Sequence, residues 1–147
     1  MAIPRSALLL GLSGVLPFLW GALTVLVPDI GRQAAPIISE RLVGPYVLTA
    51  YGIVILSFMS GVLWGFATKA GDRQGICYAL STAPALWTFF MVGGGPANAA
   101  LMLILGFIGL LGLDWQFSRW GLTPGWWMKL RLLLTTLVCG CLVTTLL

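Results

Sequence analysis

Apolar stretches of membrane-spanning length alternate with short polar or glycine-rich segments along the chain. Five such stretches cover approximately residues 7–27, 42–68, 75–92, 97–113 and 127–147. A helix rises about 1.5 Å per residue, so roughly 20 apolar residues cross the ~30 Å hydrocarbon core of a bilayer. The pattern therefore predicts an all-α, polytopic membrane protein, with one membrane domain over residues 1–147 built as a five-transmembrane-helix bundle.

Most connectors between the predicted spans are short, and two longer segments carry more information. Residues 28–41 hold four charged side chains and are interpreted as a loop, in which residues 35–42 are compatible with a short interfacial helix. Residues 114–128 hold four of the seven tryptophans: Trp115, Trp120, Trp126 and Trp127. Because indole rings favour the headgroup layer, we expect these four to anchor the segment in the interface or to contact lipid. Within the first span, Pro17 predicts a kink.

Composition supports the membrane interpretation. Only 8% of the 147 residues are charged and 59% are hydrophobic, whereas a soluble domain usually carries about 25% charged residues. The mean hydropathy is +1.01. The net charge of +4 does not indicate a nucleic-acid partner, because the basic residues flank the spans and form no run. We therefore expect membrane lipids around the chain and no nucleic acid bound to it.

The basic residues also predict the orientation of the bundle. Five crossings would leave six basic residues on the amino-terminal side of the membrane and only Arg32 and Arg41 on the other side. Because Lys and Arg are enriched at cytoplasmic ends, we expect the amino terminus in the cytoplasm and the carboxyl terminus outside. The start of the chain, with its single Arg5, does not resemble an Arg- and Ser-rich transit peptide, which favours a bacterial inner membrane.

Small residues recur at helical spacing in two of the predicted spans. The second span carries them four positions apart and the fourth carries glycines three positions apart; the set comprises Ser57, Gly61, Gly65, Gly106, Gly109 and Gly112. In lipid, such a stripe lets two helix backbones approach closely. We expect these residues to form helix-packing faces, with the second span at the centre of the bundle.

One polar cluster is predicted where three spans reach the same depth near the cytoplasmic side. The fourth span ends at Asp114, the fifth carries Arg131 about one turn from its start, and the second finishes near Trp64. We predict an ion pair between Asp114 and Arg131, covered by Trp64, with Arg119 as the rival cation. A partly buried carboxylate needs such a partner to stay charged. Two interpretations stay open: a structural link between two helices, and a polar niche that binds a ligand.

The sequence offers little equipment for catalysis. It contains no histidine, the commonest ligand for haem and zinc, and its three cysteines are interpreted as small packing residues. Every charged residue lies at a predicted span end or in a connector. A charge at mid-helix, which usually marks a path for ions or protons, is not expected here. We predict no catalytic, cofactor-binding or metal site, and no enzyme activity.

These residues also carry a resemblance to a known family. The run from Tyr51 to Gly65, with its Ile55-Leu56-Ser57-Phe58 core, resembles the signature of the transmembrane protein 69-like family, a bacterial and mitochondrial membrane family catalogued as a domain of unknown function. The resemblance extends to further positions: Gly14, Leu16-Pro17-Phe18, Asp114-Trp115, Pro124, Trp126-Trp127, Arg131-Leu132 and Leu134-Thr135. It implies a five-helix bundle and marks Trp64, Asp114 and Arg131 as shared positions.

Two functions follow from this pattern. The first is a non-enzymatic accessory, assembly or structural subunit of a larger inner-membrane complex, respiratory or photosynthetic, which would make other integral membrane subunits its partners. It rests on the small size of the bundle and on the number of small-residue faces. The alternative is a small channel or carrier, or a lipid- or quinone-binding membrane protein, suggested by the prolines and the aromatic segment.

Overall fold

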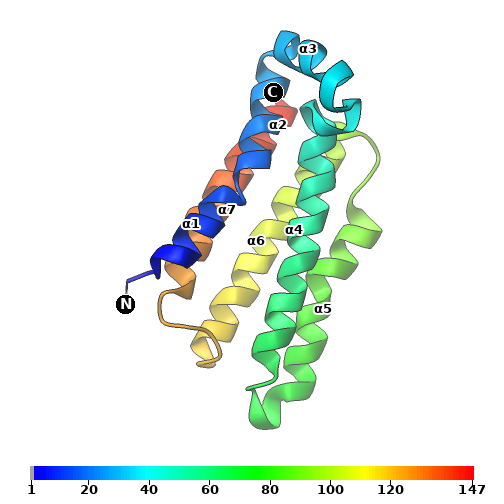
Figure 1. Cartoon of the computed structure of the whole chain (residues 1–147). Helices are drawn as coiled ribbons and strands as arrows, with labels where there is room; N and C mark the ends of the chain where they lie inside the picture. Colours follow the sequence, from blue (N-terminus) through cyan, green and yellow to red (C-terminus); the bar gives the residue numbers. More distant parts are fainter. Residues whose placement is uncertain (1) are drawn as a thin grey trace.

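The computed structural model describes residues 2–147, which form an elongated bundle of α-helices without a β-strand among these residues (Figure 1). The helices are α1 (Arg5–Ser13), α2 (Leu16–Leu26), α3 (Pro28–Ile38), α4 (Gly44–Ala67), α5 (Gln74–Met91), α6 (Pro96–Arg119) and α7 (Trp127–Val143). Short 3-10 turns cover Glu40–Leu42, Gly71–Arg73 and Thr144–Leu146. The beginning of α1 and the end of α7 lie at opposite ends of the bundle.

Length and composition suit four helical stretches of the described chain to crossing a membrane. They are Arg5–Leu26, Gly44–Ala67, Pro96–Arg119 and Trp127–Leu146. These confirm the prediction of a polytopic, all-helical membrane protein. The helix α5 is not among the four, although its 18 residues run alongside α4 (Figure 1).

The first predicted span is divided into two helices. Instead of a kink inside one helix, the chain ends α1 at Ser13 and begins α2 at Leu16. Pro17 occupies the first turn of α2, where its missing N–H breaks no helical hydrogen bond of α2. Proline therefore starts a new helix here, and the two pieces are free to pack against different neighbours.

Two connectors differ from their predicted form. Residues 28–38 form the helix α3, which lies across the end of the bundle between α2 and α4 (Figure 1), so the predicted loop with a helix over 35–42 is wrong. Pro28 begins this helix and Asp29 lies in its first turn, where an acidic side chain is favourable. The helix α6 runs to Arg119, six residues beyond the predicted end at 113, so half of the segment 114–128 is helical.

The start of α4 depends on α2. Val43, which precedes α4, offers no side-chain cap, and the backbone N–H of Gly44 instead donates to Thr24 Oγ1 over 2.7 Å. Nearby, Trp20 Nε1 donates to the carbonyl of Leu42 over 2.7 Å. Unpaired N–H groups at a helix start need partners in an apolar environment. Two side chains of α2, those of Thr24 and Trp20, therefore hold the start of α4 in place by hydrogen bonds.

The helix α4 lies at the centre of the bundle and packs against α2, α5 and α6. Its buried side chains Leu48, Leu56 and Leu63 meet Phe18, Leu103 and Phe107 in one apolar cluster. Polar groups tie α5 to this core despite its lower hydropathy: Ser60 Oγ accepts from the Ala85 N–H at 2.8 Å, and Trp87 Nε1 donates to the Met102 carbonyl at 2.7 Å.

Candidate functional site

An ion pair joins α6 to α7. Arg131 Nε donates to Asp114 Oδ2 over 2.7 Å, and the two residues are 5% and 0% exposed. Asp114 lies five residues before the end of α6 and Arg131 four residues after the start of α7, so a turn or more of helix separates the pair from either end. This is the predicted pair. The rival cation, Arg119, instead lies over the ring of Trp115, 4.9 Å from its centroid.

The indole beside the carboxylate is Trp127, not Trp64. Trp127 Nε1 donates to Asp114 Oδ1 over 2.8 Å, so both carboxylate oxygens have a donor. Trp64 is 51% exposed and stacks on Tyr78 of α5 with the ring centroids 4.5 Å apart. The predicted cover is therefore wrong: on α4 it is Phe66 that meets the Trp127 ring, 5.1 Å between centroids, whereas Trp64 faces α5.

Arg131 is less well partnered than Asp114. Its Nη2 is buried, and no hydrogen-bond acceptor of the described residues pairs with it. The hydroxyl of Thr135, one helical turn further along α7 and 6% exposed, is also buried without a partner. Buried polar groups are nearly always hydrogen-bonded, and an unpaired one costs about 1–3 kcal/mol. Two such groups on one face of one helix are unusual.

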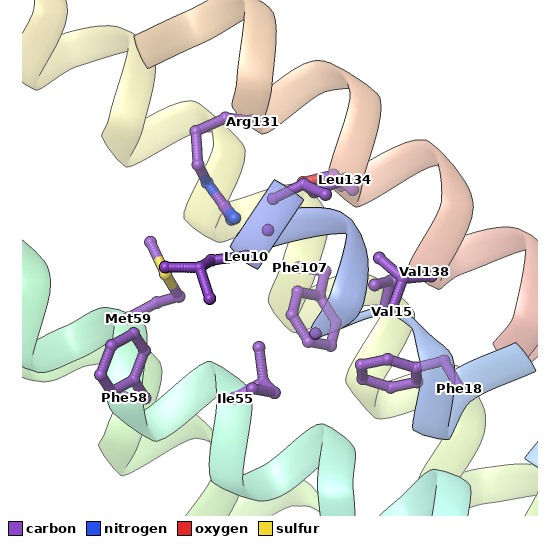
Figure 2. Close-up of a pocket in the computed structure, with 13 residues that line it drawn as sticks. Leu10, Val15, Phe18, Ile55, Phe58, Met59, Phe107, Arg131, Leu134 and Val138 are labelled. Atoms are coloured by element: carbon purple, nitrogen blue, oxygen red, sulfur yellow. The ribbon is translucent and has the colours of Figure 1, made fainter. Parts of the chain in front are cut away.

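Arg131 and Thr135 are both among the residues that line a cavity of about 170 Å³. Figure 2 shows Arg131 extending from α7 toward Leu10, with Phe107, Met59 and Val138 among the apolar side chains around the space. The wall also includes Gly11 and Gly14 at the end of α1. Apart from Arg131 and Thr135, every residue of this wall is apolar or glycine.

The break between α1 and α2 explains why this space is unfilled. Beyond the break, α2 packs tightly on α4: a Cβ at Gly21 would lie 2.6 Å from Leu48 Cγ. Before it, α1 has no buried residue and its chief contact is with α7. The mouth of the cavity accordingly lies between α1 and α4, where Leu10 and Phe58 are 73% and 64% exposed.

The predicted small-residue faces divide into one packing position and several outward-facing ones. At Gly106 a Cβ would lie 2.6 Å from Leu56 Cδ2 and 2.9 Å from Trp87, so this glycine does permit close packing. At four others, Gly61, Gly65, Gly109 and Gly112, a Cβ would meet nothing within 4 Å. Within this chain these four glycines therefore contact no neighbouring helix, because both faces of a helix in lipid are apolar and composition does not tell which one faces inward. Whether they pack against another protein stays a prediction. Ser57 faces α5, 3.3 Å from the Thr88 hydroxyl.

Close packing also occurs at two glycines outside the predicted set. At Gly21 and Gly52 an added Cβ would lie 2.6 Å and 2.7 Å from leucine side chains of neighbouring helices. Neither belongs to a stripe of three small residues, so the spacing rule could not find them. The leucines that they contact, Leu48 and Leu103, are both fully buried. This burial identifies the two glycines as packing positions, and it is known only from the fold.

The tryptophans near the lower end of the bundle have different surroundings. Trp115 is 51% exposed beneath Arg119, while Trp120 lies under Arg73, 5.7 Å from its ring centroid, and beside Phe117. Trp126 packs beside Trp127. The three indoles other than Trp127 remain predicted interfacial anchors.

No group of three or more His, Cys, Asp or Glu side chains in residues 2–147 is arranged to hold a metal ion. The three cysteines are free, with Cys77 and Cys141 buried. Among the described residues, the buried charges are those of Asp114 and Arg131, with the Thr135 hydroxyl one turn away; the other buried polar side chains are hydroxyls, those of Thr24, Ser60, Ser81 and Thr88.

Comparison with known proteins gives two findings. Residues 3–147 match the sequence family described as "Protein of unknown function (DUF3429)". The chain is also 30% identical over 148 residues to Transmembrane protein 69 of Xenopus tropicalis, covering 97% of this chain and 54% of the frog protein. The chain thus spans about half the length of that relative. No solved structure matches.

Proposed function

The chain belongs to the DUF3429 family, related to transmembrane protein 69, and from this premise we propose that it is a non-enzymatic accessory or structural subunit of a larger inner-membrane complex. The partners would be other integral membrane subunits. The observation that carries the proposal is the set of glycines that face away from the bundle.

The accessory role goes with a proposal of five crossings, which would define the surfaces that meet lipid. Both α4 and α6 run away from the end of the bundle that bears α3, and α5, which connects them along the chain, runs back beside α4 (Figure 1). If α4 and α6 each cross the membrane, the chain between them has to return across it. The 18 residues of α5 reach about 27 Å at 1.5 Å per residue, close to the hydrocarbon thickness.

The charge distribution favours an amino terminus in the cytoplasm. Arg5, Lys69, Arg73, Arg119 and Lys129 all belong to the end of the bundle opposite α3. Near α3 the basic residues are Arg32, which pairs with Asp29, and Arg41. By the positive-inside rule the α3 end faces outward, in a bacterial inner membrane the periplasm.

Outward glycines are the feature that a partner would use. In lipid there is little hydrophobic gain in covering an apolar helix, so stable contacts between helices rely on close backbone approach at small residues. Gly61 and Gly65 lie one turn apart on the exposed side of α4. Gly109 borders an apolar groove of about 260 Å³ between α5 and α6. A transmembrane helix can approach such surfaces closely, whereas the packing of a lipid acyl chain does not require small residues.

Extraction at native expression level in a mild detergent tests the proposal. We expect the chain to migrate in a complex larger than its own 15.7 kDa plus detergent, and the double variant Gly61→Leu/Gly65→Leu to release it. The control is Gly140→Leu, since Gly140 on α7 also has open space around it but lies outside both stripes. A wild-type chain that is monomeric throughout, or a complex untouched by the double variant, would contradict the proposal.

A further inference from the structure

We propose that the cavity beside Arg131 binds an uncharged, lipid-soluble molecule with a small carbonyl-bearing head. This inference is independent of the accessory role, because it concerns the interior of the bundle and not its outer glycine faces. It starts from two of the three buried side-chain groups of the described residues that have no hydrogen-bond partner, Arg131 Nη2 and the Thr135 hydroxyl.

The two donors select an acceptor oxygen. Arg131 and Thr135 are four residues apart on α7, so their side chains lie one above the other on the same helix face, and both border the same cavity. Guanidinium N–H groups only donate, and a hydroxyl can donate as well. A carbonyl oxygen has two lone pairs and satisfies both donors at once.

Charge balance selects a neutral ligand. The guanidinium of Arg131 is already neutralised by Asp114, whose two oxygens are occupied by Arg131 Nε and Trp127 Nε1. A second carboxylate or a phosphate would bring an unbalanced negative charge into a space whose other walls are apolar, at a cost of several kcal/mol. An uncharged carbonyl group gains the hydrogen bonds without that cost.

The size of the cavity limits what enters. An apolar cavity of about 150 Å³ accommodates a benzene molecule, so 170 Å³ suits one six-membered ring or a short acyl segment, and not a whole phospholipid. Any longer tail has to leave through the mouth between α1 and α4, where Leu10 and Phe58 are exposed.

The position of the cavity favours entry from the bilayer. Ile55 and Phe107, which line it, lie at the middle of α4 and α6, so a bilayer around the bundle would place the cavity at the depth of the hydrocarbon. A ligand in this site therefore diffuses in the membrane and enters sideways. Two sources share the required chemistry: a quinone ring with an apolar tail, and the ester group of an acyl lipid.

Three probes with the same tail length distinguish these sources: a decyl-substituted benzoquinone, methyl decanoate and decane. Each is added to delipidated protein in detergent, and the dissociation constant is obtained from the rise in melting temperature with probe concentration. We expect the quinone, the ester or both to bind more tightly than decane. The tighter of the two identifies the source.

The variants Thr135→Val and Thr136→Val provide the matched comparison. Thr136 is the exposed neighbour whose hydroxyl bonds to the Leu132 carbonyl, and it lies outside the cavity. Thr135→Val should weaken the carbonyl probe about fivefold, the loss of one hydrogen bond, and leave decane unchanged. Because it removes an unpartnered hydroxyl, it should also keep or raise the melting temperature without probe. Thr136→Val should bind as the wild type does.

The remaining outcomes overturn the proposal. If decane binds as tightly as the carbonyl probes, the space is an apolar void with no selectivity. If none of the probes raises the melting temperature, or if Thr135→Val binds the carbonyl probe like Thr136→Val, the two donors do not serve a ligand of this class.

Discussion

The inner and outer faces of α6 place neighbouring residues in opposite surroundings. On the inner face, a Cβ at Gly106 would meet Leu56 at 2.6 Å, and Asp114 is fully buried with a donor on each oxygen. On the outer face, Gly109 has nothing within 4 Å and Trp115 is half-exposed. Three positions separate the two glycines and one separates the aspartate from the tryptophan. In a bundle surrounded by lipid both faces of a helix are apolar, so the rotation of the helix about its own axis determines whether a residue faces the core or the lipid.

The largest difference between the two faces is expected when the carboxylate charge on the inner face is removed. Asp114→Asn should lower the free energy of unfolding by about 3 kcal/mol, because it leaves Arg131 as a buried unpaired cation. The matched control is Asp29→Asn, since Asp29 pairs with Arg32 in an exposed position on α3 and should change stability by less than about 1 kcal/mol. Titration with a denaturing detergent in mixed micelles measures both. Equal effects of the two substitutions would contradict the structural role of the inner pair.

The second largest effect is expected at the inner glycine. Gly106→Ala should destabilise the bundle by about 1–3 kcal/mol, because the new methyl group pushes on Leu56 and Trp87. Gly109→Ala meets no atom and should stabilise α6 by up to about 1 kcal/mol through helix propensity. Opposite signs in the same unfolding titration would sharpen the distinction between the faces. Two effects of the same sign would mean that α6 is rotated from the described position.

The smallest predicted effect concerns the indoles. Trp127→Phe keeps the edge-to-face contact with Phe66 but leaves Asp114 Oδ1 without its indole donor, and should cost about 1–2 kcal/mol. Trp115→Phe on the outer face should stay within about 0.5 kcal/mol. Both are measured by the melting temperature in detergent. A larger loss for Trp115→Phe would indicate that the outer indole supports the fold and not only its contact with lipid.

Much of this arrangement could be read from the sequence, and the exceptions share one cause. The helical membrane class and the pairing of Asp114 with Arg131 follow from the cost of exposing charge to hydrocarbon, which leaves few alternatives. Whether Trp127 or Trp64 donates to Asp114, and whether Gly106 or Gly109 packs inside the bundle, depends on the rotation of each helix about its axis. The hydrophobic pattern does not predict this rotation when every face is apolar. The extension of α6 beyond 113 follows from the pairing itself, since a neutralised Asp114 need not end the helix.

The cavity was harder still to foresee. It depends on the end of α1 at Ser13 and on a separate start for α2, whereas the pattern of residues 7–27 is that of one continuous span. Pro17 marks the region but does not specify a break instead of a kink. The helix α3 is not predicted for a related reason. Charges such as those of Asp29 and Arg32 indicate a loop, although here they pair on the exposed side of a helix that lies across the end of the bundle.

The contact between Thr24 and Gly44 has a consequence for biogenesis. Because the hydroxyl that receives the first amide of α4 belongs to a residue twenty positions earlier, α4 acquires its cap only after α2 is next to it. We therefore expect the two segments to form a hairpin before α6 and α7 pack against it. Bundle assembly should proceed from this hairpin outward, with α6 and α7 added to an already ordered template.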